Sequence, residues 1–351
     1  MKYLSTLFAS FSGLILMSSC GDDITNEYNE YVTNEYTNIY QKEYYSTVLS
    51  DQKEITEDIR APFLKKGDTV AVFALSNAVS KEELSAGIAK IKSWGLNVIE
   101  ADNLYNVDGR YAGTLAERVD GTQKLIDNPT VKALIAARGG YGAAMTLPFL
   151  DLEALTERPK WIVGYSDVTA LHAAVNNLGV ETIHGGMAQN LSNSTTSESL
   201  RKALFGEAEG LQISTNKNCK EGVAEGRLVG GNLSLIYSLG GTAYDLNTKQ
   251  AILFIEDTGE SNYSLDRMLT QLKLSGKLDN IVGVVVGQFI NMTQGSDKSV
   301  EEIIASKFAD QDIPIMYGVQ VGHNQPNNAL CLGRKVRLTV DASKASLKYV
   351  D

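Results

Sequence analysis

The sequence predicts an α/β protein whose N-terminal part is built around a parallel β-sheet. Between Thr69 and Gly164, apolar runs of strand length alternate with segments of helical periodicity. This alternation is typical of parallel strands that are covered by helices. The chain has 351 residues, of which 43% are hydrophobic. It can therefore bury a large core, spread over about two domains.

The first half of the chain provides the strands of this sheet. Its predicted strands are Thr69–Leu75, Asn97–Glu100, Val131–Ala137 and Trp161–Gly164. Its predicted helices are Lys81–Trp94, Ala116–Ile126 and the segment that follows Ser166. Three of the strands lead into polar residues, which are Ser76, Arg138 and Ser166. Because parallel sheets bind ligands at the carboxyl ends of their strands, we expect the functional site at this edge.

The second half of the chain predicts a further α/β domain. Its predicted strands are Gly222–Val229, Ala251–Ile255, Ile281–Val286, Ile315–Val321, Asn328–Leu332 and Lys335–Val340. Its predicted helices are Leu233–Leu239, Ser264–Ser275 and Val300–Phe308. A polar helix, Ser192–Phe205, indicates a link between the two halves. We therefore predict an N-terminal domain over residues 61–190, a linker over 191–220 and a C-terminal domain over 221–351.

The N-terminus has the features of an export signal. Lys2 precedes an apolar run, Leu14 to Met17, and two serines stand directly before Cys20. The apolar run is too short to span a membrane as a mature helix, and an ordinary signal peptide with an incidental cysteine is the alternative. The segment resembles a bacterial lipoprotein signal, which implies a signal peptide over residues 1–19 and lipid on Cys20. Residues 20–60 are polar and biased in composition, so we expect a tether to a membrane of the bacterial cell envelope.

Charge and cysteine content exclude several classes of function. The formal charge of −10 and the pI near 5.0 argue against a nucleic-acid partner, because such a chain repels the phosphate backbone. No CxxC pattern or histidine and cysteine cluster indicates a metal site, and we predict no cofactor. Cys219 and Cys331 are far apart in sequence, and whether they pair stays open.

The stretch from Trp161 to Leu171, WIVGYSDVTAL, runs from an apolar strand through a sharp turn into a helix. Ser166 stands at the turn, where a hydroxyl is exposed and backbone N–H groups gather beside it. This placement is typical of a nucleophile. The residues around Ser166 do not match the G-x-S-x-G motif of common hydrolases, and an ordinary helix N-cap is the alternative.

The loop from Arg138 to Gly142, RGGYG, follows a predicted strand. Its glycines allow a tight turn with several amides directed into one concavity, which suits an anion. The spacing matches neither the dinucleotide fingerprint nor the P-loop, so a nucleotide site is not predicted. A purely structural strand-to-helix turn is the alternative.

Histidine, the usual base near neutral pH, occurs only three times in the sequence. His172 lies six residues beyond Ser166 on the predicted helix and faces away from the turn, which favours a packing role. His184 belongs to the site or bonds to backbone, and the pattern does not decide between them. His323 follows a predicted strand, in a loop able to reach Ser166. A serine nucleophile needs such a base, and the base needs a carboxylate to orient it, for which Glu256 is the natural candidate.

Taken together, these motifs resemble the LD-carboxypeptidase family of serine peptidases. The resemblance extends from about residue 61 to about residue 340 and rests on motifs in the family's order. They are Lys66-Gly67-Asp68, Tyr111-Ala112-Gly113-Thr114, Glu117-Arg118, Arg138 to Gly142, Gly164 to Asp167, Thr169 to Leu171, His184-Gly185, Gly230 to Leu233, Ile255 to Asp257 and Gly322-His323.

The resemblance implies the architecture and the site. The N-terminal domain would carry a parallel, Rossmann-like or flavodoxin-like sheet with the nucleophile, and the C-terminal α/β domain a mixed, barrel-like sheet. Ser166 would be the nucleophile, His323 the base and Glu256 its orienting carboxylate. Amides of Asp167 and of one of Gly139 and Gly140 would form the oxyanion hole. A substrate carboxylate would need a cation, for which Arg138 and Arg267 are candidates. Tyr141 is a further candidate for substrate contact, with a place in the wall of the site or in the core as the alternative.

The activity implied is hydrolysis of an amide between an L-centre and a terminal D-amino acid. In the murein branch of the family, this reaction releases D-alanine from a tetrapeptide, so a muropeptide is the expected partner. The alternatives are a peptidase of the microcin-immunity type that acts on peptide–nucleotide conjugates, and a lipid-anchored protein that binds peptides without cleaving them. The resemblance also implies a possible homodimer.

Overall fold

The computed structural model describes residues 55, 58–295 and 297–350. The predicted signal peptide (1–19), the lipidation site Cys20 and nearly all of the predicted tether lie outside the described residues. Within the described ranges, no helix has both the length and the apolar character needed to cross a membrane.

A six-stranded sheet forms the first half of the fold, in the order β11-β5-β4-β3-β1-β2. Its strands are β1 (Thr69–Phe73), β2 (Asn97–Glu100), β3 (Val131–Ala136), β4 (Trp161–Gly164), β5 (Thr182–His184) and β11 (Leu330–Leu332). The first five strands are parallel, and β11 runs antiparallel to β5. The order 2-1-3-4-5 is the flavodoxin-like arrangement, in which ligands bind at the carboxyl ends of the strands.

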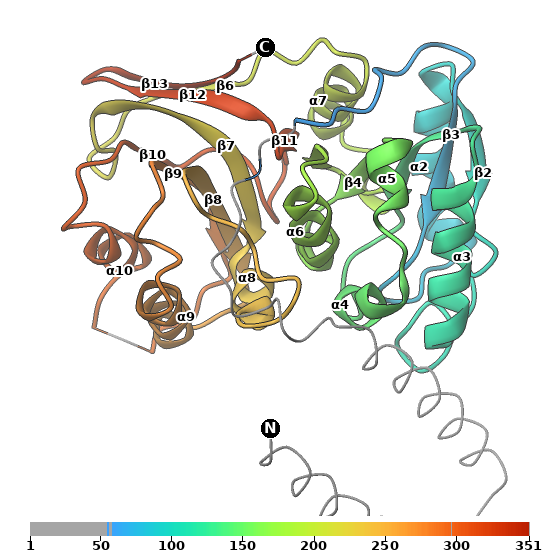
Figure 1. Ribbon diagram of the computed structural model, residues 1–351, viewed down its shortest axis with the longest axis horizontal. Coiled ribbons are helices and arrows are strands. Elements are labelled where there is room, and N and C mark those ends of the chain that lie inside the picture. The colour runs from blue at the N-terminus through green and yellow to red at the C-terminus, as the bar shows by residue number, and fades with distance from the viewer. Residues whose placement is uncertain (1–54, 56–57, 296, 351) are drawn as a thin grey trace, which may run out of the picture. The chain divides into compact units, whose positions relative to one another are not determined.

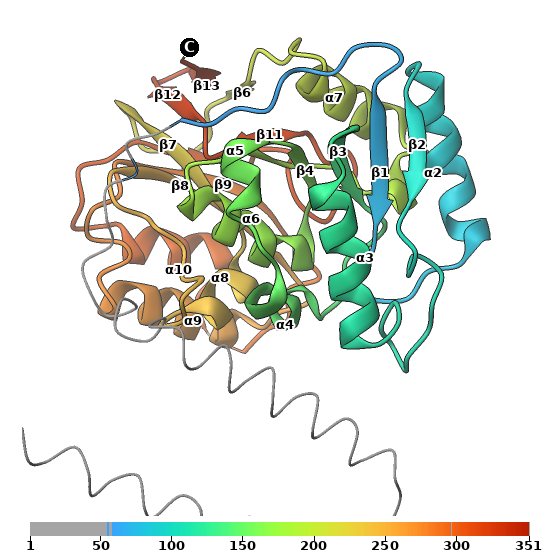
Figure 2. The same ribbon diagram turned by 45° about the vertical axis from the view of Figure 1, so that its right-hand side comes forward.

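Helices join these strands and cover the sheet (Figure 2). They are α2 (Lys81–Ser93), α3 (Leu115–Asp127), α4 (Ala143–Thr146), α5 (Ala154–Glu157), α6 (Thr169–Asn177) and α7 (Ser194–Leu204). Capping boxes start the two long crossover helices, with Ser80 and Glu83 at α2 and Thr114 and Glu117 at α3. These boxes satisfy backbone N–H groups that the first turn leaves free, so the helices begin at defined residues.

A seven-stranded mixed sheet forms the second half, in the order β10-β9-β8-β7-β12-β13-β6. Its strands are β6 (Leu211–Ser214), β7 (Gly222–Asn232), β8 (Ala251–Thr258), β9 (Gly283–Ile290), β10 (Ile315–Tyr317), β12 (Lys335–Val340) and β13 (Lys344–Tyr349). Helices α8 (Leu233–Leu239), α9 (Asn262–Leu274) and α10 (Val300–Lys307) belong to this half. The predicted α/β class, with a parallel-rich sheet followed by a mixed sheet, is confirmed.

Two elements connect the sheets. Helix α6 is buried from Thr169 to Asn176, and the Thr169 hydroxyl accepts a hydrogen bond from the Asn232 amide of β7 at 3.0 Å. Strand β11 lies between the two halves (Figure 1). Its side chains alternate between two cores. Leu330 and Leu332 pack into the core of the second sheet, and Cys331 packs into the larger core. Residues 330–332, which follow the predicted site histidine, therefore complete the sheet of the predicted N-terminal domain.

The structure contains strands that the sequence does not predict. β6 and β13 alternate between buried or half-buried and exposed residues near an edge of the second sheet, where apolar patterning is weak. Strand β8 also extends to Thr258, so Glu256 lies within the strand and not beyond its end. Cys219 and Cys331 are both free thiols.

Candidate active site

Ser166 has the backbone conformation of a strained turn residue. Its φ is 60°, in the left-handed region. Ser166 directly follows the extended Tyr165 and is the first residue of a short 3-10 helix, Ser166–Val168. No side-chain capping bond starts this helix or α6, and within the described ranges the Ser166 hydroxyl has no hydrogen-bond partner. The N-cap alternative is therefore excluded. A left-handed conformation costs a non-glycine residue about 1 kcal/mol or more, and such strain is concentrated at functional sites.

The glycine loop after β3 lies directly beside Ser166. A Cβ atom added to Gly139 would stand 3.0 Å from Ser166 Cβ and 3.1 Å from its Oγ. Gly140 has a φ of 129°, and a Cβ there would collide with the Asn77 side chain at 2.2 Å. Glycine is therefore required at Gly140, and at Gly139 it leaves room next to the serine hydroxyl for a reacting group.

The residue after the serine holds this loop in place. Asp167 is fully buried, and its Oδ2 accepts hydrogen bonds from Ser76 Oγ at 2.5 Å and from the Ala143 amide at 2.8 Å. Burial raises the pKa of the Asp167 carboxyl, and these two hydrogen bonds oppose that rise. The loop that contains Gly139 and Gly140 is thus tied to the residue that follows Ser166.

Arg118 supports the glycine loop. The sequence assigns this residue no role beyond its place in the family pattern. Its side chain is 1% exposed, and Nη1 donates to the carbonyls of Leu75 at 2.6 Å and Gly142 at 3.1 Å. The guanidinium also lowers the pKa of Asp167. Arg118 therefore fixes the far end of the glycine loop, a role visible only once β1 and the loop are placed together.

His323 and Glu256 form a pair in which the glutamate is buried and the histidine is partly buried. The His323 Nδ1 atom lies 2.7 Å from Glu256 Oε2, and Glu256 is 0% exposed within β8. Burial raises the pKa of the Glu256 carboxyl, and the hydrogen bond with His323 opposes that rise. Since a carboxylate only accepts hydrogen bonds, Nδ1 carries the proton and Nε2 is left free to act as a base. A Cβ added to Gly322 would stand 2.8 Å from Glu256 Oε2, so glycine is required there for this approach.

Tyr165, directly before Ser166, contacts the pair formed by His323 and Glu256. Its ring meets the His323 ring edge-on, with centroids 5.0 Å apart, and its hydroxyl accepts a hydrogen bond from Asn190 Nδ2 at 2.9 Å. Burial raises the Tyr165 pKa to about 12, so the phenol stays neutral. Among the described residues, no hydrogen bond joins Ser166 to His323. Catalytic hydrogen bonds are often long in the unliganded state and tighten when substrate binds.

The other two histidines are buried in the core. His172 Nε2 lies 2.9 Å from the Gly164 carbonyl, and burial lowers its pKa to about 4, which agrees with a packing role. His184 is fully buried, and neither ring nitrogen has a hydrogen-bond partner in the described structure. Burial also lowers the His184 pKa well below its usual value. Its ring packs against Phe254 and Tyr165, at 5.0 Å and 5.9 Å, so it is neither a backbone anchor nor a base at neutral pH.

The three candidate substrate contacts differ in position. Arg138 and Tyr141 are in the glycine loop, where Arg138 Nη1 donates to the Ala78 carbonyl at 3.2 Å and Tyr141 is half exposed. Arg267 lies over the Tyr263 ring in α9, 5.5 Å from its centroid. No contact between described residues connects Arg267 to Ser166 or His323. The described residues also contain no group of three or more histidine, cysteine, aspartate or glutamate side chains that suits a metal ion.

Comparison with family models identifies two matching regions. Residues 70–185 match the LD-carboxypeptidase N-terminal domain, and residues 225–338 match the LD-carboxypeptidase C-terminal domain. The first match includes Ser166 and the glycine loop, and the second includes Glu256 and His323. Both sides of the site thus lie in regions that the family models cover.

Individual relatives agree with this result. A probable murein peptide carboxypeptidase of Bacillus subtilis is 33% identical over 296 residues, which is 81% of this chain and 93% of that protein. A murein tetrapeptide carboxypeptidase of Pseudomonas aeruginosa is 30% identical over 285 residues, or 76% and 91% of the two chains. The structure of the microcin immunity protein MccF in complex with glutamyl sulfamoyl guanosine superimposes with a TM-score of 0.74, at 25% identity over 83% of this chain and 99% of that chain.

Proposed function

Because this chain belongs to the LD-carboxypeptidase family and is a serine-type carboxypeptidase, we propose that Ser166, His323 and Glu256 form its catalytic triad. The observation that carries the proposal is the 2.7 Å contact between His323 Nδ1 and Glu256 Oε2, beside a strained serine turn. The pair directs Nε2 of the imidazole away from the carboxylate. The left-handed backbone of Ser166 presents its hydroxyl free of other partners.

The proposed reaction proceeds through an acyl-enzyme. Ser166 Oγ attacks the scissile carbonyl while His323 Nε2 takes the hydroxyl proton, and Glu256 stabilises the imidazolium that forms. Amides of Asp167 and of Gly139 or Gly140 receive the developing oxyanion, and each donor of this kind contributes about 3 kcal/mol. The imidazolium then protonates the leaving amine. Water, activated by the same histidine, hydrolyses the acyl-enzyme.

The proposed substrate is a murein tetrapeptide that loses its terminal D-alanine. Support comes from the names of the relatives in Bacillus subtilis and Pseudomonas aeruginosa, which refer to murein peptides. Arg138 is the better placed of the two candidate cations for the substrate carboxylate, because it precedes Gly139 in the loop beside Ser166. The Glu83 carboxylate, 3.6 Å from Arg138 Nη1, partly neutralises it in the free protein.

A second candidate function is the cleavage of peptide–nucleotide conjugates. It is favoured by the similarity to MccF, whose solved complex contains glutamyl sulfamoyl guanosine. A protein that only binds peptides is a weaker candidate, since binding alone gives no reason to place a carboxylate-paired histidine beside a strained serine.

We also propose that the protein is exported and anchored to a bacterial membrane through lipid on Cys20, with residues 20–60 as the tether. The sequence before Cys20 supports this proposal. Labelling cells with a fatty-acid probe should mark the wild-type protein, and Cys20→Ala should abolish the label and release the protein from the membrane fraction. An unlabelled wild-type protein would contradict the anchor.

The activity is tested by incubating the purified protein with a murein tetrapeptide and following the mass of the product. We expect the loss of one alanine with wild-type protein and an intact tetrapeptide with Ser166→Ala. If both proteins leave the tetrapeptide intact, the murein assignment fails. A parallel incubation with a glutamyl sulfamoyl nucleoside then decides whether the second candidate function holds.

A further inference from the structure

The segment that carries His323 passes from one sheet to the other. On either side of His323, Gly322 lies against Glu256 of β8, and the Asn324 amide donates to Gln288 Oε1 of β9 at 2.8 Å. After it, β11 pairs with β5 in the sheet that contains the nucleophile turn. The position of His323 relative to Ser166 therefore depends on how this segment is attached to the elements of the first sheet.

Helix α7 makes that attachment through Thr196. The Thr196 Oγ1 hydroxyl donates to Gln325 Oε1 at 2.5 Å and accepts from the Asn327 amide at 2.9 Å. The Asn327 Oδ1 atom in turn accepts from the Gly322 amide at 3.0 Å. Hydrogen bonds therefore run from α7 to the residue directly before His323.

The side chains of Thr196 and Asn327, which connect α7 to Gly322, are inaccessible to solvent. Thr196 and Asn327 are each 0% exposed. The backbone of Thr196 is itself fixed, because its amide donates to the N-cap side chain of Asn193 at 3.0 Å. A buried hydroxyl with both a donor and an acceptor role cannot be replaced by water without a change in packing. The loop conformation around His323 is thus tied to the start of α7.

We propose that Thr196 is a positioning residue for the catalytic base, acting through Asn327 and Gly322. This inference rests on the proposed role of His323 as that base. Thr196 is 127 residues from His323 in sequence and does not itself contact substrate in this account. Its hydroxyl sets the backbone that delivers the imidazole to both Glu256 and the serine turn.

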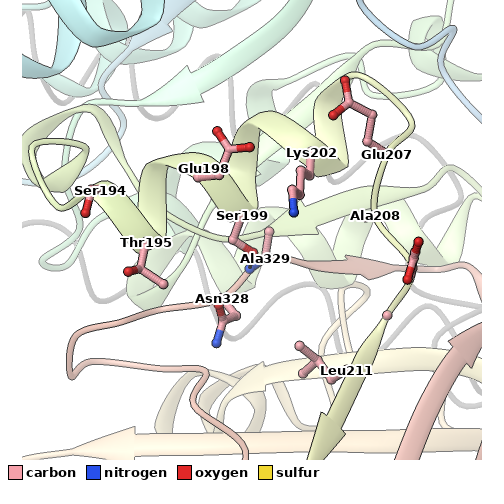
Figure 3. Close-up of a pocket in the computed structure, with 12 residues that line it drawn as sticks. Ser194, Thr195, Glu198, Ser199, Lys202, Glu207, Ala208, Leu211, Asn328 and Ala329 are labelled. Carbon is pink, nitrogen blue, oxygen red and sulfur yellow. Dashed lines mark hydrogen bonds between the residues drawn. The ribbon is translucent and has the colours of Figure 1, made fainter.

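The same helix supplies a matched control. Ser199 Oγ accepts a hydrogen bond from the Ala329 amide at 2.9 Å, which attaches the segment beyond the base. Ser199 and Ala329 both line a pocket of about 680 Å³, and Figure 3 shows Ser199 beside Ala329 there. Water in this pocket can take over the bond to the Ala329 amide. Loss of the Ser199 hydroxyl should therefore affect His323 much less than loss of the Thr196 hydroxyl.

The test compares Thr196→Val, Thr196→Ser and Ser199→Ala in the full-length protein, with murein tetrapeptide as substrate. Valine keeps the shape of threonine but removes both hydrogen bonds, and a misplaced catalytic group loses rate by about tenfold to a hundredfold. We expect that loss in kcat for Thr196→Val with KM nearly unchanged. Thr196→Ser should restore most of kcat, and Ser199→Ala should stay close to wild type.

Equal kcat in Thr196→Val and wild type would overturn the assignment, and so would a loss that Thr196→Ser fails to restore. Should Thr196→Val not fold, Gln325→Ala removes the acceptor of the Thr196 hydroxyl from an exposed position. It should lower kcat by about threefold or more, and an unchanged kcat contradicts the proposal.

An NMR measurement that does not need turnover tests the positioning role independently of the proposed function. The His323 Nδ1 proton, held by Glu256, should give a downfield NMR signal that reports the position of the ring. Thr196→Val should shift or broaden this signal, whereas Ser199→Ala should preserve it. A signal unchanged in Thr196→Val contradicts the positioning role even if wild-type protein releases no alanine from the tetrapeptide.

Discussion

The nucleophile side and the base side of the site are held in place by different means. Ser166 is fixed by the conformation of its own turn and by neighbours from one sheet, among them Gly139 and Asp167. His323 lies on a segment between the sheets and depends on side chains distant in sequence, such as Glu256 and Thr196. The first side is therefore sensitive to local backbone changes, and the second to substitutions far along the chain.

On the base side, loss of the carboxylate that orients the histidine should reduce activity strongly. Replacing Glu256 by glutamine keeps the side-chain shape but removes the charge that orients and stabilises the imidazolium, so kcat on the tetrapeptide should fall by about 10⁴-fold. The adjacent buried carboxylate, Asp257, bonds to Asn232 and Ser234 instead of His323. Asp257→Asn should therefore cost kcat far less. Similar losses of kcat in the two variants would show that any buried charge at this position supports activity, and that the pair of Glu256 with His323 has no special role.

The nucleophile side should be sensitive to a single methyl group. Gly139→Ala would place Cβ 3.0 Å from Ser166 Cβ, in the space assigned to the reacting group. We expect kcat to fall by about 10²-fold or more, the effect of losing one oxyanion donor. Gly240→Ala, where the nearest atom is the movable end of the Gln271 side chain, is the control. Full activity in Gly139→Ala would exclude the glycine loop from the site.

The buried His184 ring packs against Tyr165 on the nucleophile side and Phe254 of β8 on the base side. Its burial predicts that stability depends on pH. Because burial lowers the folded-state pKa of His184, the unfolded state binds more protons below pH 6.5, and stability is lost as pH falls through that value. This one group should therefore lower the unfolding free energy as the pH falls from 8 to 5. His184→Phe should remove that part of the pH dependence in urea titrations. An identical pH dependence in the variant would mean that His184 does not titrate on unfolding.

The smallest expected effect concerns the strain at the nucleophile turn. Ser166→Gly should be more stable than Ser166→Ala by about 1 kcal/mol, because glycine adopts a φ of 60° without a Cβ penalty. Thermal unfolding of the two variants measures the difference, and neither should be active. Equal melting temperatures would show that the turn relaxes and stores no strain.

Much of the nucleophile side could be predicted from sequence. The apolar run of β4 and the polar turn after it placed Ser166 correctly at a strand end. The exclusion of an N-cap depended on the backbone angle of Ser166, which no sequence pattern reports. Arg118 was missed as a support of the glycine loop, because its partners Leu75 and Gly142 are 43 and 24 residues away.

The base side of the site could be predicted less well from the sequence. Glu256 and His323 gained their roles from family resemblance, since a glutamate in a strand and a histidine in a loop have no distinctive local pattern. Thr196 was part of a helix that the sequence assigned to a linker, and its contact with Asn327 spans 131 residues. Such contacts exist only after two sheets are assembled, which is why sequence patterns could not predict them.

The central claim is that Ser166 and His323, held by these different means, act as one unit. The most direct measurement is kcat for alanine release from murein tetrapeptide by Ser166→Ala, His323→Ala and the double variant. Each single variant should lose about 10⁶-fold, and the double variant should lose no more than either one, because members of a triad act together. If the losses multiply in the double variant, or if either single variant keeps wild-type activity, the account is contradicted.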